Sequence, residues 1–395
     1  MDEETPLVVN GSNQQTQALK NHWRDVHILS SAFLLVFLAY GAAQNLESTV
    51  NTEGDLGTIS LGILLSLFYV FLICGFPSCE NIGFEKMPWY TMIPAAVYVG
   101  FAASIIWVGL GTYLTSTSLG HAKDYGLHQG TVLGDFNGEF WGVCASHQFI
   151  GSLISLALLR DGEGGSTSGT TLLFTVFLCS MTLGNILMCF LSKDESRTEK
   201  RNTESSISWF SSLVSLLKSV VVLLLDIKML LIIPHIEYSG LQQAFYVVKP
   251  ALGVSGVGGS MAVYTAFDAL CSLSAGRLTS GLSSITFIVS GGAFALGILG
   301  VLYPLVMAAI LGIGDGIFNM QLSALLGLLF KHDTEGAFAQ LKVWQSGAVA
   351  VVFFISPHIS MSAMLVVMVA ALCIAMSGFL FLTLRIKKAL AASSS

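Results

Sequence analysis

Charged residues are scarce in this sequence. Asp, Glu, Lys and Arg make up 11% of the 395 residues, whereas soluble globular proteins carry about 25% charged residues. The 18 Lys and Arg residues are too few and too dispersed for the phosphate-contacting surface that nucleic-acid binding requires. Because 53% of the residues are hydrophobic, we exclude both a nucleic-acid-binding protein and an ordinary soluble domain.

The motifs that carry catalysis or hold metal ions are also missing. The sequence contains no nucleophile elbow, no phosphate-binding Walker loop and no HExxH zinc motif. Its seven cysteines form no CxxC pair and no Cys/His spacing typical of a metal site. We predict a protein without enzymatic activity, cofactor or metal, and we expect its cysteines to be buried free thiols.

Long apolar runs fill most of the chain. Runs of this length are typical of membrane-spanning helices, so we predict an all-α polytopic membrane protein with eleven visible spans. They cover residues 28–44, 57–76, 92–115, 140–159, 170–191, 229–248, 253–274, two crossings within 282–330, 337–355 and 361–384. A polar loop is expected at 116–137, and an interfacial helix at 207–225, where serines and leucines gather on different faces.

Basic residues in short loops mark the cytosolic side of a membrane protein. Lys193 and its neighbours in the linker 192–206, Arg277, Lys331 and the basic C-terminal tail are mutually consistent with that side. Arg24 would place the N-terminus there too, yet five spans in the first half would place it outside. We therefore predict that one crossing is missing between residues 57 and 92, with an outside N-terminus as the alternative.

These features divide the chain into two transmembrane halves. The predicted parts are a cytosolic tail (1–27), an N-terminal half (28–191), a cytosolic linker with the interfacial helix (192–227), a C-terminal half (228–384) and a cytosolic tail (385–395). A shift of 196 to 203 residues aligns the halves, for example Tyr40–Gln44 with 238–242, 109–111 with 312–314, and 138–140 with 336–338. Two parallel repeats are how major facilitator transporters are built, so the missing crossing would be the third helix of the first half.

Several strings in the chain resemble the Unc-93-like family, especially its plant members. They include LGTISLG (56–62), GFAASIIWVG (100–109), YSGLQQAF (238–245), AAILGIGDG (308–316) and LLFKHDTEGAFAQLKVWQS (328–346). The resemblance implies a major-facilitator-like fold of two six-helix halves. It also implies regulation of two-pore-type potassium channels, or escort of immune receptors, for animal members, and potassium homeostasis for plant members. The chain departs from the family at 64–90 and is shortened at 294–303.

The resemblance leads to one main expectation of function and two alternatives. We expect a regulator of potassium transport or channel activity, embedded in the lipid bilayer, whose partner is a potassium channel or another membrane protein. The alternatives are a secondary transporter of an ion or small solute, with Asp315 as its coupling acid, and an escort factor for another membrane protein. Both termini should be cytosolic, and plasma membrane and endomembrane both stay open.

Asp315 is the strongest polar candidate in the apolar runs. Asn319 follows one helical turn later, and Gln321 lies nearby in sequence. A carboxylate at that depth is costly in lipid and should face a protein interior or a wet cavity. Two interpretations stay open: an ion, proton or substrate site, or an acid that fixes helix packing. Gly312 and Gly316 have the small-xxx-small spacing of a helix-packing face.

Further candidates come from the repeat and from the second half. The first helix of each half is expected to line the cavity through Tyr40, Gln44, Tyr238, Gln242 and Gln243. Asp268 precedes Gly276-Arg277 by eight residues in a gating-loop-like arrangement at the cytosolic edge, where a structural charge relay is expected. Trp107 and Trp344 are expected to be packing residues.

Overall fold

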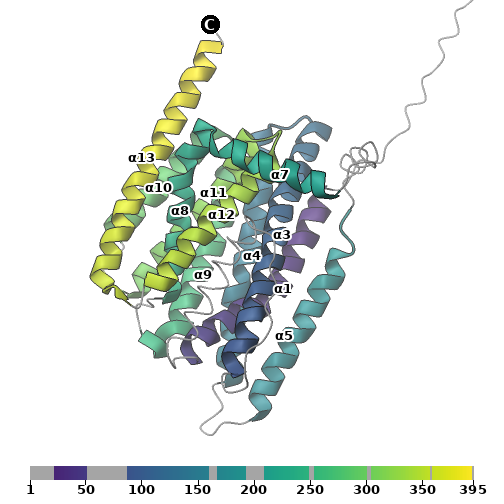
Figure 1. Cartoon of the computed structure of the whole chain (residues 1–395), viewed down its shortest axis with the longest axis vertical. Coiled ribbons are helices and arrows are strands. Elements are labelled where there is room, and N and C mark those ends of the chain that lie inside the picture. The colour runs from purple at the N-terminus through teal and green to yellow at the C-terminus, as the bar shows by residue number, and fades with distance from the viewer. Residues whose placement is uncertain are drawn as a thin grey trace, which may run out of the picture.

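The structure of the chain is a computed structural model that describes residues 22–50, 87–159, 167–192, 209–248, 253–299, 304–355 and 358–393. Within these ranges eleven α-helices and no strands are present, which confirms the all-α prediction. The helices, drawn in Figure 1, are α1 (His22–Val50), α3 (Met87–Asp124), α4 (Gln129–Leu159), α5 (Thr167–Met188), α7 (Trp209–Leu224), α8 (Ile227–Val248), α9 (Gly253–Leu278), α10 (Leu282–Leu299), α11 (Pro304–Leu329), α12 (Thr334–Ile355) and α13 (Met361–Ser393). The predicted span 57–76 lies outside the described residues.

Large apolar side chains face outward from this bundle. Tyr98 on α3, Phe287 on α10 and Leu384 on α13 are among the most exposed residues of the described part. An exposed apolar surface of this extent marks contact with lipid rather than with water. By length and composition, the described helices that could cross a membrane alone are Ala308–Leu329, Thr334–Ile355 and Ser362–Lys388, with the bent pair α7–α8 as a fourth. The protein is an integral membrane protein.

The predicted polar loop at 116–137 is wrong. Helix α3 continues to Asp124 and α4 begins at Gln129, so the turn between them is short. The polar residues stay helical because their side chains bond to their own helix: the Ser118 hydroxyl donates to the Leu114 carbonyl, and the Asn137 amide donates to the Leu133 carbonyl. Gly126, with a φ of 65°, terminates α3 in the left-handed region that glycine favours.

Helix α7 lies across the upper end of the bundle in Figure 1. Its direction differs by 88° from that of α8, which follows at once. It is held there from α12 and the turn before it, because the Gln340 amide donates to the Val220 carbonyl at 2.7 Å and the Ser219 hydroxyl donates to the Asp333 carboxylate. This position is the one that an interfacial helix would take.

A glycine stripe on α4 brings the two halves together. Four glycines recur at every fourth position of α4 and face α9 or the turn that follows it: Gly130, Gly134, Gly138 and Gly142. A Cβ on Gly138 would lie only 2.6 Å from the Gly276 Cα. This close backbone approach depends on the absence of side chains from both glycines. The fourfold spacing was a sequence signal for the interface between the halves that our sequence analysis missed.

The five described cysteines are free, as predicted, but most of them are not buried. Cys144 lies in the core, whereas Cys179, Cys189 and Cys373 are exposed and Cys271 is partly exposed. The prediction of burial fails because these helices turn an apolar face outward to lipid, where a thiol fits as a small hydrophobic group.

Basic residues gather at one end of the bundle. Every Lys and Arg of the described ranges except Lys342 lies there: Arg24, Lys123, Lys218, Lys228, Arg277, Lys331, Arg385, Lys387 and Lys388. Contacts join the helix ends that carry them. His22 at the start of α1 lies 3.0 Å from Asp124 at the end of α3, and the Lys331 ammonium donates to the Gln129 amide oxygen.

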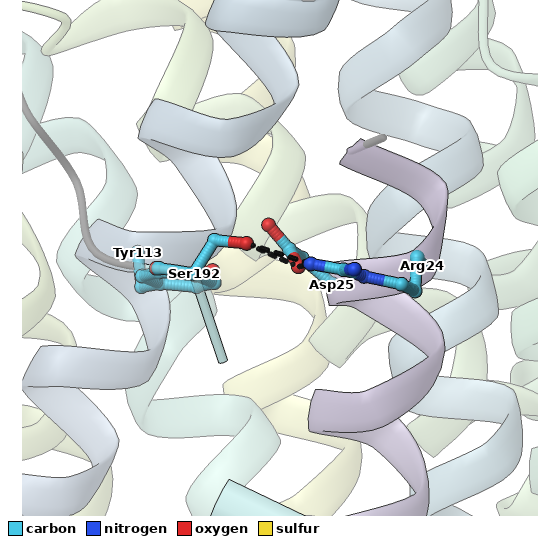
Figure 2. Close-up of polar contacts among 4 residues, drawn as sticks. All are labelled: Arg24, Asp25, Tyr113 and Ser192. Atoms are coloured by element: carbon cyan, nitrogen blue, oxygen red, sulfur yellow. Dashed lines mark hydrogen bonds and ion pairs between the residues drawn. The ribbon is translucent and has the colours of Figure 1, made fainter. Parts of the chain in front are cut away.

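The chain leaves α1 and enters α3 at the opposite end of the bundle from these basic residues, because His22 and Asp124 pair the start of α1 with the end of α3. The start of α1 also meets Ser192, the first residue of the linker (Figure 2). This geometry agrees with placing the N-terminus and the linker on one side.

A buried polar contact fixes that meeting point. The Asp25 carboxylate is fully buried, with 0% exposure, and accepts a hydrogen bond from the Ser192 hydroxyl at 2.9 Å. The Arg24 guanidinium reaches both residues, at 3.4 Å from Asp25 and 3.0 Å from Ser192. Tyr113 of α3 donates from its hydroxyl to the Ser192 carbonyl at 3.3 Å (Figure 2). The start of the linker is thereby tied to α1 and α3.

Replacing Asp25 by alanine should release this end of the linker. A hydrogen bond to a charged group contributes about 2 kcal/mol, so Asp25→Ala is expected to lower the free energy of unfolding by about that amount. Limited proteolysis should then cut the linker 192–206 faster than in the wild type. Lys123→Ala is the matched control: this side chain is exposed at the end of α3 and lies outside the contact, so its loss should cost under about 0.5 kcal/mol. An equal effect of both substitutions would contradict the anchoring role of Asp25.

Candidate functional site

Asp315 lies inside the second half of the bundle, on α11, with 6% exposure. Asn319 stands one turn later on the same face, so its amide donates to the Asp315 Oδ1 at 2.6 Å. Gln345 of α12 donates from Nε2 to the Asn319 Oδ1, and to the Ser239 hydroxyl of α8, at 3.1 Å each. The structure thus joins three helices through one buried polar network.

Lys342 completes this network, and the sequence analysis missed it. Its ammonium donates to the Gln345 Oε1 at 2.8 Å, and the residue is 8% exposed. The ammonium also lies 4.5 Å from the centre of the Trp107 ring and 5.8 Å from that of Trp141, a cation–π arrangement. Lys342 is the one Lys or Arg in the apolar run 337–355, and this signal could have revealed it.

Trp107 and Trp141 come from the first half, on α3 and α4. Their rings stack with centres 5.8 Å apart and planes 7° apart. The Trp141 Nε1 donates to the Ser323 hydroxyl of α11 at 3.2 Å. Trp107 therefore packs, as expected, and also forms part of the surface on which the Lys342 ammonium rests. The network consequently reaches across the interface between the halves.

Asp268 belongs to the same interior region, which corrects its expected place at the cytosolic edge. Helix α9 runs unbroken through Gly276 and Arg277 to Leu278, so no loop adjoins Asp268. The Ser272 hydroxyl donates to the Asp268 Oδ1 at 3.2 Å, and Asp268 and Asp315 are close enough to repel each other. Gly276 instead packs against α4, and Arg277 is exposed at the helix end.

The remaining predicted site residues do not form one cluster, because each described one contacts a different part of the bundle. Gln321 faces away from Asn319, because two residues rotate a helix by about 200°, and it donates to the Thr279 hydroxyl at 2.8 Å. Gln242 donates to the Leu311 carbonyl at 2.6 Å, and Tyr238 packs against Phe318 within electrostatic range of Asp315. The side chains of Tyr40, Gln44 and Gln243 lie outside the described ones.

Chemically, this site holds two acids and one base in an apolar bundle. Ionisable residues inside a membrane domain are costly and mark candidate ion, proton or substrate sites. In the described part of the chain, no group of three or more His, Cys, Asp or Glu residues is arranged to hold a metal ion. The arrangement suits electrostatic binding of a small ion or a change of protonation rather than bond-making chemistry.

The fold is major-facilitator-like, as predicted, because it is similar to that of a solved proton symporter. The E. coli fucose:proton symporter aligns with 92% of this chain and 99% of its own length, with a TM-score of 0.51 and 12% sequence identity. At that identity the likeness shows the fold alone.

Sequence comparison then identifies the family. The family model described as "Ion channel regulatory protein UNC-93" matches residues 60–251 and 298–381. UNC93-like protein 3 of Arabidopsis thaliana is 58% identical over 93% of this chain and 88% of its own length. A Caenorhabditis elegans protein whose name proposes unc-93 as a potassium channel regulatory protein is 27% identical over 92% of this chain and 60% of its own length. The chain belongs to the UNC-93 family, as the resemblance predicted.

Proposed function

We propose that this protein regulates potassium transport by acting on a partner membrane protein, such as a potassium channel. The observation that carries the proposal is the match to the UNC-93 family over both halves of the chain. The name of the Caenorhabditis elegans relative supports potassium as the ion. The cluster of basic residues at one end of the bundle supports cytosolic N- and C-termini, with the halves 28–191 and 228–384 crossing the bilayer.

Co-expression with a channel tests this proposal. The full chain is expressed with a two-pore-type potassium channel in a cell that lacks both, and whole-cell potassium current is recorded alongside the amount of channel at the surface. A change in current at constant surface channel supports regulation. A loss of surface channel on deleting the chain, together with co-purification of the two proteins, would instead indicate an escort factor. Unchanged current and unchanged delivery would refute both roles.

The second candidate function is secondary transport of a cation, and the network around Asp315 favours it. Symporters and antiporters need an interior group whose charge changes with ion binding, at the interface of their two halves. Reconstituted protein should then show cation- or proton-coupled flux that Asp315→Asn abolishes, while Lys331→Met, at the exposed cytosolic end, leaves flux intact. The absence of flux in liposomes would remove this candidate.

A further inference from the structure

We propose that Lys342 is a tethered cation that competes with a small monovalent cation for the carboxylates of Asp315 and Asp268. The proposal rests on the proposed role of Asp315 as an interior cation site and adds the basic group that is linked to that site by hydrogen bonds through Gln345 and Asn319. Lys342 therefore has a regulatory role. Its positive charge lowers the affinity of the carboxylates for mobile cations, so only a cation that binds tightly enough can compete with it.

Charge balance at the site supports this competition. The two carboxylates and one ammonium carry a net charge of −1 when all three are ionised, in a region enclosed by helices. Uncompensated charge is costly in such surroundings. One additional monovalent cation would neutralise the group, whereas a divalent cation would leave it positive. In that fully ionised state, the balance of charge favours a monovalent ligand.

The direction of the hydrogen bonds also supports a charged lysine facing an ionised acid. Each donor points from the base toward the acid: Lys342 donates to Gln345, Gln345 donates to Asn319, and Asn319 donates to Asp315. Such a chain is fully satisfied when the lysine is protonated and Asp315 is ionised at its two ends. The ammonium and the Asp315 carboxylate interact electrostatically through this pair of amides. The ammonium therefore stabilises the Asp315 carboxylate through the two amides rather than by a direct hydrogen bond.

Further oxygen atoms that suit a small cation lie on α8 and α11, the helices that meet at Asp315. Gln242 is fully buried, and its Oε1 has no hydrogen-bond partner although its Nε2 bonds to α11 one turn before Asp315. Ser239 and the Asn319 carbonyl add further oxygens at the same helix crossing. Hard cations are bound by carboxylate, amide and hydroxyl oxygens. An orphaned buried acceptor on a side chain bonded to α11 one turn before Asp315 is a feature that a cation would explain.

The position of Lys342 links the site to the contact between the halves. Its ammonium rests on the indoles of Trp107 and Trp141 from the first half, while its hydrogen bond goes to Gln345 in the second half. When a mobile cation neutralises the acids, the electrostatic hold on the ammonium weakens. Occupancy of the site would then alter how strongly α12 is held against α3 and α4. The other titratable side chains close to these charges are Tyr238, Cys144 and Cys271.

Thermal unfolding of the purified full-length chain tests the competition. Potassium chloride or sodium chloride is added in place of an equal concentration of the chloride salt of a bulky organic cation, so that ionic strength stays constant. The melting temperature is then measured as a function of potassium or sodium concentration. The wild type should respond weakly, and Lys342→Met should bind the cation roughly tenfold more tightly, a ratio within the usual range of coupling between sites. Asp315→Asn should abolish the response in either background. Lys331→Met is the matched control and should behave as the wild type does.

The arms of the experiment separate the possible cations. A response to potassium or sodium identifies an alkali cation. A response of Lys342→Met to lower pH alone, abolished by Asp315→Asn, identifies the proton, and both results support the proposal. Equal cation midpoints in Lys342→Met and Lys331→Met would overturn it. If Lys342→Met does not yield folded protein, persistence of the wild-type response in Asp315→Asn overturns it. The assay needs neither a channel nor flux, so its failure is distinct from that of the proposed function.

Discussion

Replacing Gly312 by alanine is expected to lower the free energy of unfolding by about 3 kcal/mol, at the upper end of the usual cost of overpacking. A Cβ on Gly312 would lie 2.0 Å from the Tyr264 carbonyl oxygen of α9 and 2.8 Å from its carbonyl carbon. These atoms belong to backbone and cannot rotate away, so α9 and α11 must separate. Because a Cβ on Gly316, one turn later, would lie 2.4 Å from the Asp268 carbonyl oxygen, the helices are also close there, and the separation would disturb the acid pair.

Thermal unfolding in detergent and the yield of monodisperse protein would measure this loss. Gly291→Ala is the matched control, since a Cβ there meets nothing within 4 Å. In an exposed helix position alanine is favoured over glycine by up to about 1 kcal/mol, so the control should be neutral or slightly stabilised. Similar stability of the two variants would show that α9 and α11 are not packed as closely as the structure has them.

Lys342→Met is expected to destabilise the protein by about 3 kcal/mol when the only cation in the buffer is bulky. Removing one partner from a buried charged group costs about 3–5 kcal/mol because the remaining charge is left uncompensated. Here the substitution removes the ammonium that interacts with Asp315, while Asp268 and Asp315 still repel each other, and it also removes the cation over Trp107. Adding Asp315→Asn should restore part of the loss, because it removes one of the two repelling carboxylates.

A double-mutant cycle on these two positions measures the coupling directly. The double variant Lys342→Met/Asp315→Asn should be more stable than Lys342→Met alone. Lys331→Met, which removes an exposed ammonium, should change stability by less than about 0.5 kcal/mol. Strictly additive losses in the cycle would show that Lys342 and Asp315 do not interact, and would remove the electrostatic basis of the network.

Much of the fold could be predicted from the sequence. The apolar runs located the described spans, and the charges predicted that the N-terminus and the linker share one side, where Asp25 meets Ser192. The polar loop at 116–137 was wrong because hydroxyl and amide side chains can bond to their own helix backbone, so polarity alone did not end the helix. The class and family followed from strings that the comparisons then matched.

The site was predicted less completely. Asp315 and Asn319 were identified together because their spacing of four places them on one helix face. Gln321 was grouped with them by proximity in sequence, although helix rotation turns it to Thr279. Lys342 was overlooked because its role depends on Trp107 and Gln345, which lie 235 residues before it and one turn after it. Its isolation in the apolar run 337–355 was a local signal, but no local pattern reports the contact with Trp107.

The sequence by itself determined that the chain is a helical membrane protein of the UNC-93 family, and that a carboxylate lies inside its second half. These properties follow from hydropathy, from charge in short loops and from specific strings, which are all local. Only the tertiary structure decided that Asp315, Asp268 and Lys342 form one charged group at the interface of the halves. The physical reason is that electrostatic coupling depends on distance through the bundle, and helix packing sets that distance through close contacts such as that of Gly312 with Tyr264.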